Sequence, residues 1–329
     1  MQESFKAFRI HAGKDFERAG IETLTLDDLS QGDVVIEVEY SSVNYKDALA
    51  GTGKGKILRT SPLNGGIDLA GEVVSSTSEL IQVGQTVLVN GSGLSEVHDG
   101  GYSEYARVPA DWVVPMPKGL TTRTSMIIGT AGFTAALAIQ RLQDNHQMPD
   151  QGPILVTGAS GGVGSFTVQL LSQLRYHVVA MTRKQQAHDY LTDLGAQEII
   201  SPDEVKVDSA PMHKGRWAGA IDSLGGDTLA WLTKSVKPWG NIVSIGMAGG
   251  VNVNTTAMPF ILRGVSLLGV TSASCPQQLR KQIWEKLSNE LLPNNLDQIC
   301  TAEVKLETLT DAFNRLLHGD ISGRQIVCL

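Results

Sequence analysis

The stretch that decides the fold is Ile154-Leu155-Val156-Thr157-Gly158-Ala159-Ser160-Gly161-Gly162-Val163-Gly164. An apolar run, a glycine-rich turn and the start of an amphipathic segment follow one another, which is the order of strand, loop and helix in a dinucleotide-binding unit. The loop fits an A-x-G-x-x-G pattern, in which Gly161 leaves room for a pyrophosphate and Gly164 lets helix and strand pack closely. A tight turn without a ligand is the alternative.

The helix that follows this loop would offer free N–H groups and a partial positive charge to a phosphate. We therefore expect the cofactor contacts of this region to come from four consecutive residues, Ser160, Gly161, Gly162 and Val163.

The end of the next apolar run, 178–181, predicts which nicotinamide cofactor binds. Sites for NAD usually place an acidic residue there to bind the ribose hydroxyls. This chain has Thr182, Arg183 and Lys184 instead. Two cations and a hydroxyl would hold a 2′-phosphate that a carboxylate would repel, so we expect NADPH. The alternative is that the two cations belong to a solvated helix start.

Outward from this motif, apolar strands alternate with helical segments from about residue 124 onward. Strands are expected at 154–156, 178–181, 198–200, 218–222, 241–245 and 266–270, and helices at 130–142, 166–174 and 189–194. Such alternation predicts a parallel sheet covered on both faces. The first 120 residues instead read as short β-strands with frequent glycines, typical of a small barrel. The tail adds helices at 279–291 and 309–317 and a strand at 325–329.

Composition narrows the class of protein. The chain has 329 residues, 42% of them hydrophobic and 19% charged, and a formal net charge of −7. These values exclude disorder as the main state and argue against a dedicated nucleic-acid binder. No apolar run approaches the ~20 residues of a membrane span. Cys275, Cys300 and Cys328 are too few and too clustered for a disulfide framework, so we expect a cytoplasmic protein.

Ordered sequence blocks resemble the medium-chain dehydrogenase/reductase superfamily over essentially the whole chain. The blocks are Asn44-Tyr45-Lys46-Asp47, Gly66-Ile67-Asp68-Leu69-Ala70-Gly71-Glu72-Val73, Val83-Gly84-Gln85-Thr86-Val87, Gly101-Tyr102-Ser103-Glu104-Tyr105, the glycine loop and Gly323-Arg324-Gln325-Ile326-Val327. Within the superfamily the chain looks like the quinone-oxidoreductase-like branch, and most of all like bacterial NADPH-dependent acryloyl-CoA reductases. That closer likeness is carried by 44–49, 52–57, 126–135 and 258–263.

The resemblance implies an α/β protein with a GroES-like β-barrel catalytic domain (1–123), a Rossmann NADPH-binding domain (124–268) and a return to the catalytic domain (269–329). It implies that Asn44 and Tyr45 are the catalytic residues and lie at the nicotinamide end. It adds cofactor contacts at Tyr45, Thr130, Gly246, Met247, Ile261, Ser272 and Arg324. Zinc-bearing relatives have a Cys in the early loop and a Gly-His-Glu motif. Here Ile67 replaces that His and no Cys precedes residue 275, so we expect no metal.

Without a Lewis acid, reduction of an activated C=C bond suits the site better than alcohol oxidation. Tyr45 could contact the cofactor, donate a hydrogen bond or deliver the proton, although an ordinary pKa of about 10 makes a phenol a reluctant acid. Solvent is an equally good proton source.

A cationic loop follows the Asn44–Asp47 block. Its cations Lys54, Lys56 and Arg59 could hold the phosphates of a coenzyme A thioester, or could be a solvated loop. We expect an NADPH-dependent reductase of acryloyl-CoA or a similar small-molecule enoyl thioester. The alternatives are a quinone or enone reductase and a non-catalytic nicotinamide-binding regulatory protein. The family also implies a homodimer that forms through the sheet edge at 266–274.

Overall fold

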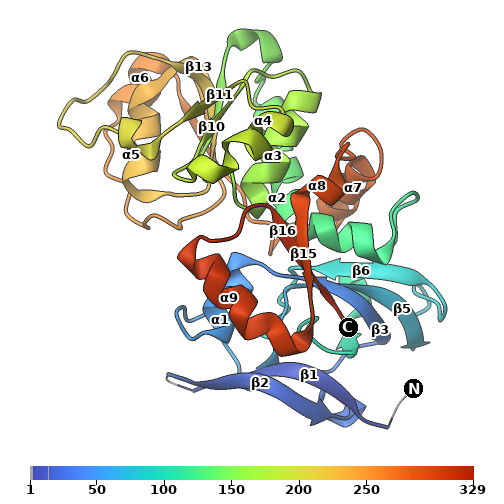
Figure 1. The fold of residues 1–329 in the computed structure, drawn as a ribbon. Coiled ribbons are helices and arrows are strands. Elements are labelled where there is room, and N and C mark those ends of the chain that lie inside the picture. Colours follow the sequence, from blue (N-terminus) through green and yellow to red (C-terminus); the bar gives the residue numbers. More distant parts are fainter. Residues whose placement is uncertain (1–2, 14) are drawn as a thin grey trace. The chain divides into compact units, whose positions relative to one another are not determined.

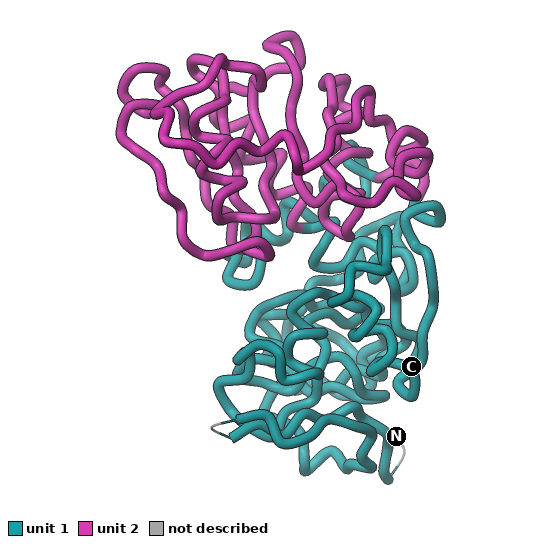
Figure 2. The backbone as a smooth tube through the Cα atoms, turned by 60° about the vertical axis from the view of Figure 1, so that its left-hand side comes forward, with its two compact units in different colours: residues 1–133, 272–292, 296–329 teal, residues 134–271, 293–295 magenta. Residues whose placement is uncertain are grey.

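The computed structural model describes residues 3–13 and 15–329, which divide into two compact units (Figure 2). Unit 1 comprises Met1–Phe133, Ser272–Leu292 and Leu296–Leu329, and unit 2 comprises Thr134–Thr271 and Pro293–Asn295. The chain thus leaves the first unit, builds the second and returns to the first.

Unit 1 is built on β-structure whose strand pairs are antiparallel except for the parallel pair of β15 with β16 (Figure 1). One sheet has the order β2-β1-β4, and the larger one has the order β15-β16-β3-β5-β6-β8, with β7 paired to β3. In β3 the alternating residues Val34, Ile36 and Val38 are buried in the barrel core. The strands are β1 (Phe5–Ala12), β2 (Phe16–Leu24), β3 (Val34–Ser42), β4 (Leu63–Asn64), β5 (Asp68–Ser76), β6 (Thr86–Asn90), β7 (Tyr105–Val108), β8 (Val114–Pro115), β15 (Cys300–Val304) and β16 (Arg324–Cys328).

The helices of unit 1 come from both ends of the chain. They are α1 (Tyr45–Gly51), α7 (Gln277–Leu287), α8 (Leu296–Ile299) and α9 (Leu309–His318). Helix α9 packs against α1 (Figure 1) so closely that a Cβ on Gly51 would lie 2.4 Å from the Phe313 ring. Strand β16 also pairs with β3, with Ile326 opposite Ser42. The C-terminal segment therefore completes the barrel that the N-terminal segment begins.

Helix α2 (Thr122–Asp144) starts eight residues before the segment predicted at 130–142. It is interrupted at Gly129, whose φ of 47° and ψ of −158° are not helical. Among the described residues it is the one helix long and apolar enough to cross a membrane, yet 83% of its apolar window is buried inside the protein. Burial of that kind is typical of a core helix.

Unit 2 contains a six-stranded parallel sheet with the order β11-β10-β9-β12-β13-β14. Strand order reverses between β9 and β12, and in open α/β sheets ligands bind at this switch point, beyond the carboxyl ends of the strands. The strands are β9 (Ile154–Val156), β10 (Val178–Met181), β11 (Glu198–Ile200), β12 (Trp217–Asp222), β13 (Val236–Ser244) and β14 (Ser266–Gly269), and the helices are α3 (Gly162–Gln173), α4 (His188–Asp193), α5 (Gly226–Ser235) and α6 (Met258–Arg263).

This sheet and the barrel confirm the predicted fold class, a GroES-like β-barrel combined with a Rossmann-type parallel sheet. All six residues of β12 are buried, as expected for a strand covered on both faces.

Candidate functional site

The glycine loop of unit 2 has the geometry of a phosphate-binding turn. Gly158 has a φ of 60°, and a Cβ on Gly164 would lie 2.3 Å from the Gly158 carbonyl oxygen, so neither position suits a side chain. Gly161 caps α3 and has no side chain to accept a hydrogen bond from the first turn. The N–H groups of that turn are therefore available, and with the helix dipole they suit a pyrophosphate.

The residues that follow β10 contact the glycine loop through side-chain hydroxyl groups. Ser160 Oγ lies 3.1 Å from Thr182 Oγ1, which also accepts a hydrogen bond from the Lys184 N–H at 3.1 Å. The Arg183 side chain is exposed, and the structure shows no ion pair for it within residues 3–13 and 15–329. The hydroxyls of Ser160 and Thr182 are thus neighbours, and the exposed Arg183 directly follows Thr182 in the chain.

Three other predicted contacts lie elsewhere in unit 2. Gly246 and Met247 lie in the loop after β13, at the same carboxyl edge of the sheet, and Met247 is 68% exposed. A Cβ on Gly246 would lie 2.6 Å from the Ser223 carbonyl oxygen. Ile261 lies on α6, with 79% of its surface exposed.

In unit 1 a buried polar cluster joins three segments that are far apart in the sequence. We call it the Asp68 cluster, and it consists of Ser42, Asn44, Asp47, Asp68, Thr130 and Arg324. The Asp68 carboxylate is fully buried. It accepts hydrogen bonds from the Thr130 N–H at 3.0 and 3.1 Å, from the Thr130 hydroxyl at 2.6 Å, from Asn44 Nδ2 at 2.9 Å and from the Ser42 hydroxyl.

The break in α2 makes this cluster possible. At Gly129 the helix backbone lies directly on the polar groups, because a Cβ there would be 2.8 Å from Arg324 Nη2 and 2.9 Å from Asp68 Oδ2. The helix restarts at Thr130, whose N–H points at the carboxylate instead of at a helical carbonyl. Only a glycine with positive φ fits this approach.

Asn44 is held from both ends of its amide. Nδ2 donates to Asp68 and, at 3.0 Å, to Asp47, while Oδ1 accepts from Arg324 Nη1 at 3.1 Å. With 8% of its surface exposed, it keeps no amide hydrogen free for a ligand. These hydrogen bonds fix the side chain of Asn44, which directly precedes Tyr45, the first residue of α1.

The Asp68 cluster holds two carboxyl groups and one guanidinium. The pKa of Asp47 is raised to about 7, first by burial and then by the nearby Asp68 carboxylate, against hydrogen bonds from Asn44 and Ile67 that lower it. Burial likewise lowers the pKa of Arg324, which donates to the carbonyls of Val43 and Ile127. At neutral pH Asp47 is therefore partly protonated.

Tyr45 is the accessible member of the predicted catalytic pair. It is the first residue of α1 and is 46% exposed. Across the described parts of the chain no hydrogen bond to its hydroxyl is found, so the hydroxyl is free to meet a ligand. Ser272 is partly exposed, and its carbonyl accepts from Arg280 Nη2 at 3.2 Å.

Residues 3–13 and 15–329 contain no group of three or more His, Cys, Asp or Glu side chains that could hold a metal ion. Ile67, at the position of the zinc-ligand histidine of relatives, is buried, and Asn44 is already engaged by two carboxylates. His98 has both ring nitrogens near backbone carbonyls, at 2.9 Å from Gln31 and 3.1 Å from Asp99.

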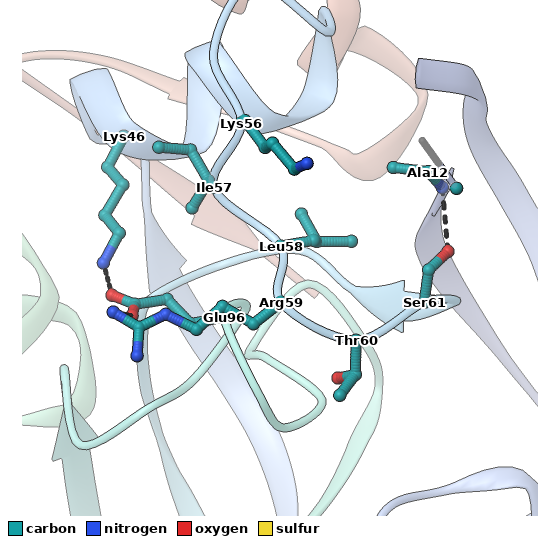
Figure 3. Close-up of a pocket in the computed structure, with 10 residues that line it drawn as sticks. Ala12, Lys46, Lys56, Ile57, Leu58, Arg59, Thr60, Ser61 and Glu96 are labelled. Atoms are coloured by element: carbon teal, nitrogen blue, oxygen red, sulfur yellow. Dashed lines mark hydrogen bonds and ion pairs between the residues drawn. The ribbon is translucent and has the colours of Figure 1, made fainter. Parts of the chain in front are cut away.

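The cationic loop of unit 1 borders a pocket of about 560 Å³, which we call the cation pocket (Figure 3). Lys56 and Arg59 line it, whereas Lys54, exposed on the same loop, does not. Figure 3 shows Lys46 reaching from α1 to Glu96, which also faces Arg59 Nη2 at 4.0 Å. The cation pocket thus presents three cations and one carboxylate.

Sequence reasoning missed Asp68, Asp47, Lys46 and Glu96. Asp47 and Asp68 stand in two of the blocks that resemble the family, but only the fold shows that they meet. The sole sequence signal was that Asp68 is an acid between apolar residues, where an unpaired charge would be costly.

Two family models match the chain. "Alcohol dehydrogenase GroES-like domain" covers residues 30–118, and "Zinc-binding dehydrogenase" covers residues 162–289. The acrylyl-CoA reductase AcuI of Ruegeria pomeroyi is 41% identical over 314 residues, with 94% of each chain covered.

Two crystal structures are also similar over nearly their whole length. Escherichia coli K-12 YhdH with bound NADPH has a TM-score of 0.94 and 43% identity, with 98% of this chain and 99% of that chain covered. Bacillus subtilis protein yhfP with NAD bound has a TM-score of 0.95 and 43% identity, with 100% of both chains covered. The matched models, the two-unit fold and the identity over the full length together show that this chain belongs to the medium-chain dehydrogenase/reductase superfamily.

Proposed function

We propose that this protein reduces the C=C bond of acryloyl-CoA, or of a similar short 2-enoyl-CoA, with hydride from NADPH. The observation that carries the proposal is the 41% identity with an acrylyl-CoA reductase over 94% of both chains. The barrel and the Rossmann-type sheet supply the two units that an oxidoreductase of this superfamily uses.

The choice of NADPH rests on the end of β10. A 2′-phosphate would meet the hydroxyls of Ser160 and Thr182 and the free guanidinium of Arg183. The E. coli neighbour was crystallised with NADPH and the B. subtilis neighbour with NAD. NAD sites usually have a carboxylate at the position that Thr182 occupies here. Because this chain has no carboxylate there and has Arg183 next to it, the local charge favours NADPH over NADH.

When bound, NADPH supplies a hydride to the β-carbon of the substrate. Hydride addition would leave an enolate, whose negative charge on the thioester oxygen needs hydrogen-bond donors, and a proton added to the α-carbon would complete the reduction. Tyr45, with an exposed and unpaired hydroxyl, is the side chain of unit 1 that we assign to the reacting groups, as a contact, a donor or a proton source. The Asp68 cluster holds the backbone from which Tyr45 projects.

The cation pocket is the proposed site for the phosphates of coenzyme A. Lys56 and Arg59 line it, and both are exposed to solvent. Cations that border a pocket of an otherwise acidic chain attract phosphate groups.

A quinone or other α,β-unsaturated carbonyl compound is the second candidate substrate, favoured by one feature of the same pocket. Lys46 and Arg59 already face the Glu96 carboxylate. Cations that are paired within the protein do not require a phosphate, and a neutral substrate would leave that arrangement undisturbed.

The test compares NADPH oxidation with acryloyl-CoA, naphthoquinone and acrolein in parallel. The proposal expects kcat/KM to be highest for acryloyl-CoA. A preference for naphthoquinone would replace it with the second candidate. NADPH binding without turnover of any of the three would indicate a regulatory binding protein.

We also propose a homodimer. Strand β14 is an edge strand with β13 as its neighbour in the sheet, and its Leu267 is 42% exposed. Exposed edge strands favour pairing with another chain. Light scattering after gel filtration should give twice the monomer mass, and a monomer at micromolar concentration would refute the proposal. The three free cysteines fit the cytoplasmic location that we propose.

A further inference from the structure

A second pocket of unit 1 adjoins the cation pocket. Its volume is about 360 Å³, within the range of small-molecule sites. The two pockets share Arg59 and Glu96. A ligand too long for either pocket can therefore extend from one to the other past these two side chains. We call the second one the Trp112 pocket.

One wall of the Trp112 pocket is apolar and aromatic. Trp112 is partly exposed and packs edge-on against His98, with ring centroids 5.0 Å apart, which fixes the plane of the indole. Val97 beside it is 47% exposed. Gly93 keeps the space beside the ring open, because a Cβ there would lie 3.3 Å from Trp112 Cη2. A fixed and accessible aromatic face suits a planar base.

Another part of the lining comes from the start of α7, with Gln277 and Arg280. Pro276 precedes this helix, and no side chain caps its first turn. Gln277 Nε2 is buried without a hydrogen-bond partner, and Arg280, with 1% of its surface exposed, has an unpartnered Nε. The other guanidinium nitrogens of Arg280 donate to backbone carbonyls, and no carboxylate pairs with it among the described residues. The start of α7 therefore presents the buried charge of Arg280 and the free N–H groups of a helix start, which favour an anion, while Glu96 and Asp111 are the carboxylates of the lining.

We propose that the Trp112 pocket binds the adenosine 3′-phosphate end of coenzyme A, with the base on the Trp112 ring. This inference rests on the proposed function and extends it from the phosphates to the far end of the substrate. Because the two pockets meet at Arg59 and Glu96, adenosine 3′-phosphate in the Trp112 pocket would let the diphosphate continue past Arg59 into the cation pocket. The exposed carboxylate of Asp111, which also lines the pocket, can accept a hydrogen bond from the amino group of adenine.

The test measures binding of adenosine 3′,5′-bisphosphate and of coenzyme A by isothermal titration calorimetry. The protein is first saturated with NADPH, so that the nucleotide site of unit 2 is occupied. The wild type is compared with Trp112→Leu and with Arg59→Gln. The control is Trp239→Leu, which removes an indole that is 82% exposed in unit 2 and lines neither pocket.

The Trp112→Leu variant should bind both ligands on the order of tenfold more weakly, because base stacking on an aromatic side chain is lost. Arg59→Gln should weaken both, and Trp239→Leu should change neither. With Trp112→Leu, KM for acryloyl-CoA should rise by a similar factor while KM for acrolein stays the same. Thermal unfolding of each variant confirms that it is folded.

Equal affinity of the wild type and Trp112→Leu for the bisphosphate would overturn the inference, as would a wild type that does not bind it. The proposed function fails in a different way, by absence of acryloyl-CoA turnover. If turnover is absent but the bisphosphate binds and depends on Trp112, the pocket assignment stands and the substrate assignment falls.

Discussion

Replacing Asp68 with Asn should destabilise unit 1 strongly, although the two side chains have the same shape. The carboxylate accepts four hydrogen bonds, from Ser42, Asn44 and, twice, Thr130. An amide has one oxygen, so its NH₂ group must face donors on one side of the site. About two charge-assisted hydrogen bonds are lost, each contributing roughly 1.5–3 kcal/mol.

Arg324 adds to this cost, because its buried guanidinium loses a nearby negative charge. Removing one partner of a buried charged group costs about 3–5 kcal/mol. The two estimates describe overlapping interactions, so we expect a total of about 3–5 kcal/mol, which corresponds to a loss in Tm on the order of 10 °C.

Thermal unfolding followed by circular dichroism measures this effect. The control is Asp320→Asn, also in unit 1, because Asp320 is exposed and its side chain has no partner among the described residues. If Asp68→Asn unfolds within about 2 °C of the control, the Asp68 cluster does not hold the segments together, and the role given to it here is wrong.

Four further changes test other parts of the account. Asp47→Asn should flatten the dependence of stability on pH. The pKa of Asp47 is about 7 in the folded protein, against an ordinary value of 3.8. Between these two values the folded state holds a proton on Asp47 that the unfolded state has lost, so the stability of the wild type falls as pH rises. That loss amounts to on the order of 1 kcal/mol between pH 6 and pH 8, and an unchanged slope of Tm against pH would contradict it. Arg183→Ala should raise KM for NADPH about tenfold and leave KM for NADH unchanged; equal effects would remove Arg183 from phosphate recognition. Gly164→Ala should lower Tm and abolish NADPH binding, since the new Cβ would lie 2.3 Å from the Gly158 carbonyl oxygen. The control Gly20→Ala should leave Tm unchanged, because nothing lies within 4 Å of a Cβ there. Similar Tm values for the two variants would be evidence against close packing at the loop. Tyr45→Phe should lower kcat for acryloyl-CoA on the order of tenfold or more, and a variant with unchanged kcat and KM would show that its hydroxyl takes no part.

The nucleotide-binding half could be predicted from the sequence because its signals are local. The loop at Gly158–Gly164 and the residues after β10 lie next to the strands that place them, so the spacing of glycines and the absence of an acid at Thr182 are enough to predict a nucleotide site there. Helix α5 (Gly226–Ser235) was missed, since its glycines and polar residues hide the apolar face. Strand β15 was missed because it is short and its residues alternate between partly buried and exposed.

The Asp68 cluster could not be predicted, because its members come from 42–68, 130 and 324 and meet only in the folded barrel. The resemblance named Asn44 as a catalytic residue and, separately, Thr130 and Arg324 as cofactor contacts. The structure shows a carboxylate that connects Asn44 and Thr130, with Arg324 bonded to the same Asn44 amide. The sequence also does not reveal that Gly129 interrupts a helix and so lets Thr130 reach Asp68. A single glycine in an apolar segment predicts only a position of lower helix propensity.

The sequence also could not predict which charged side chains line the cation pocket. A loop with Lys54, Lys56 and Arg59 suggested three equivalent contacts, yet Lys54 does not line the pocket, and Lys46 from α1 does. Glu96, which faces Lys46 and Arg59, comes from a loop some forty residues further along the chain. Which cations share a pocket depends on the tertiary fold rather than on their spacing.

Isotope transfer tests the proposed reaction most directly. The protein is incubated with acryloyl-CoA and NADPH deuterated at one or the other C4 position, and the thioester product is analysed by mass spectrometry. We predict propionyl-CoA that carries a single deuterium at its β-carbon with one of the two labelled cofactors. Unlabelled propionyl-CoA from both, or acryloyl-CoA recovered unchanged from a protein that binds NADPH, would contradict hydride transfer to the C=C bond.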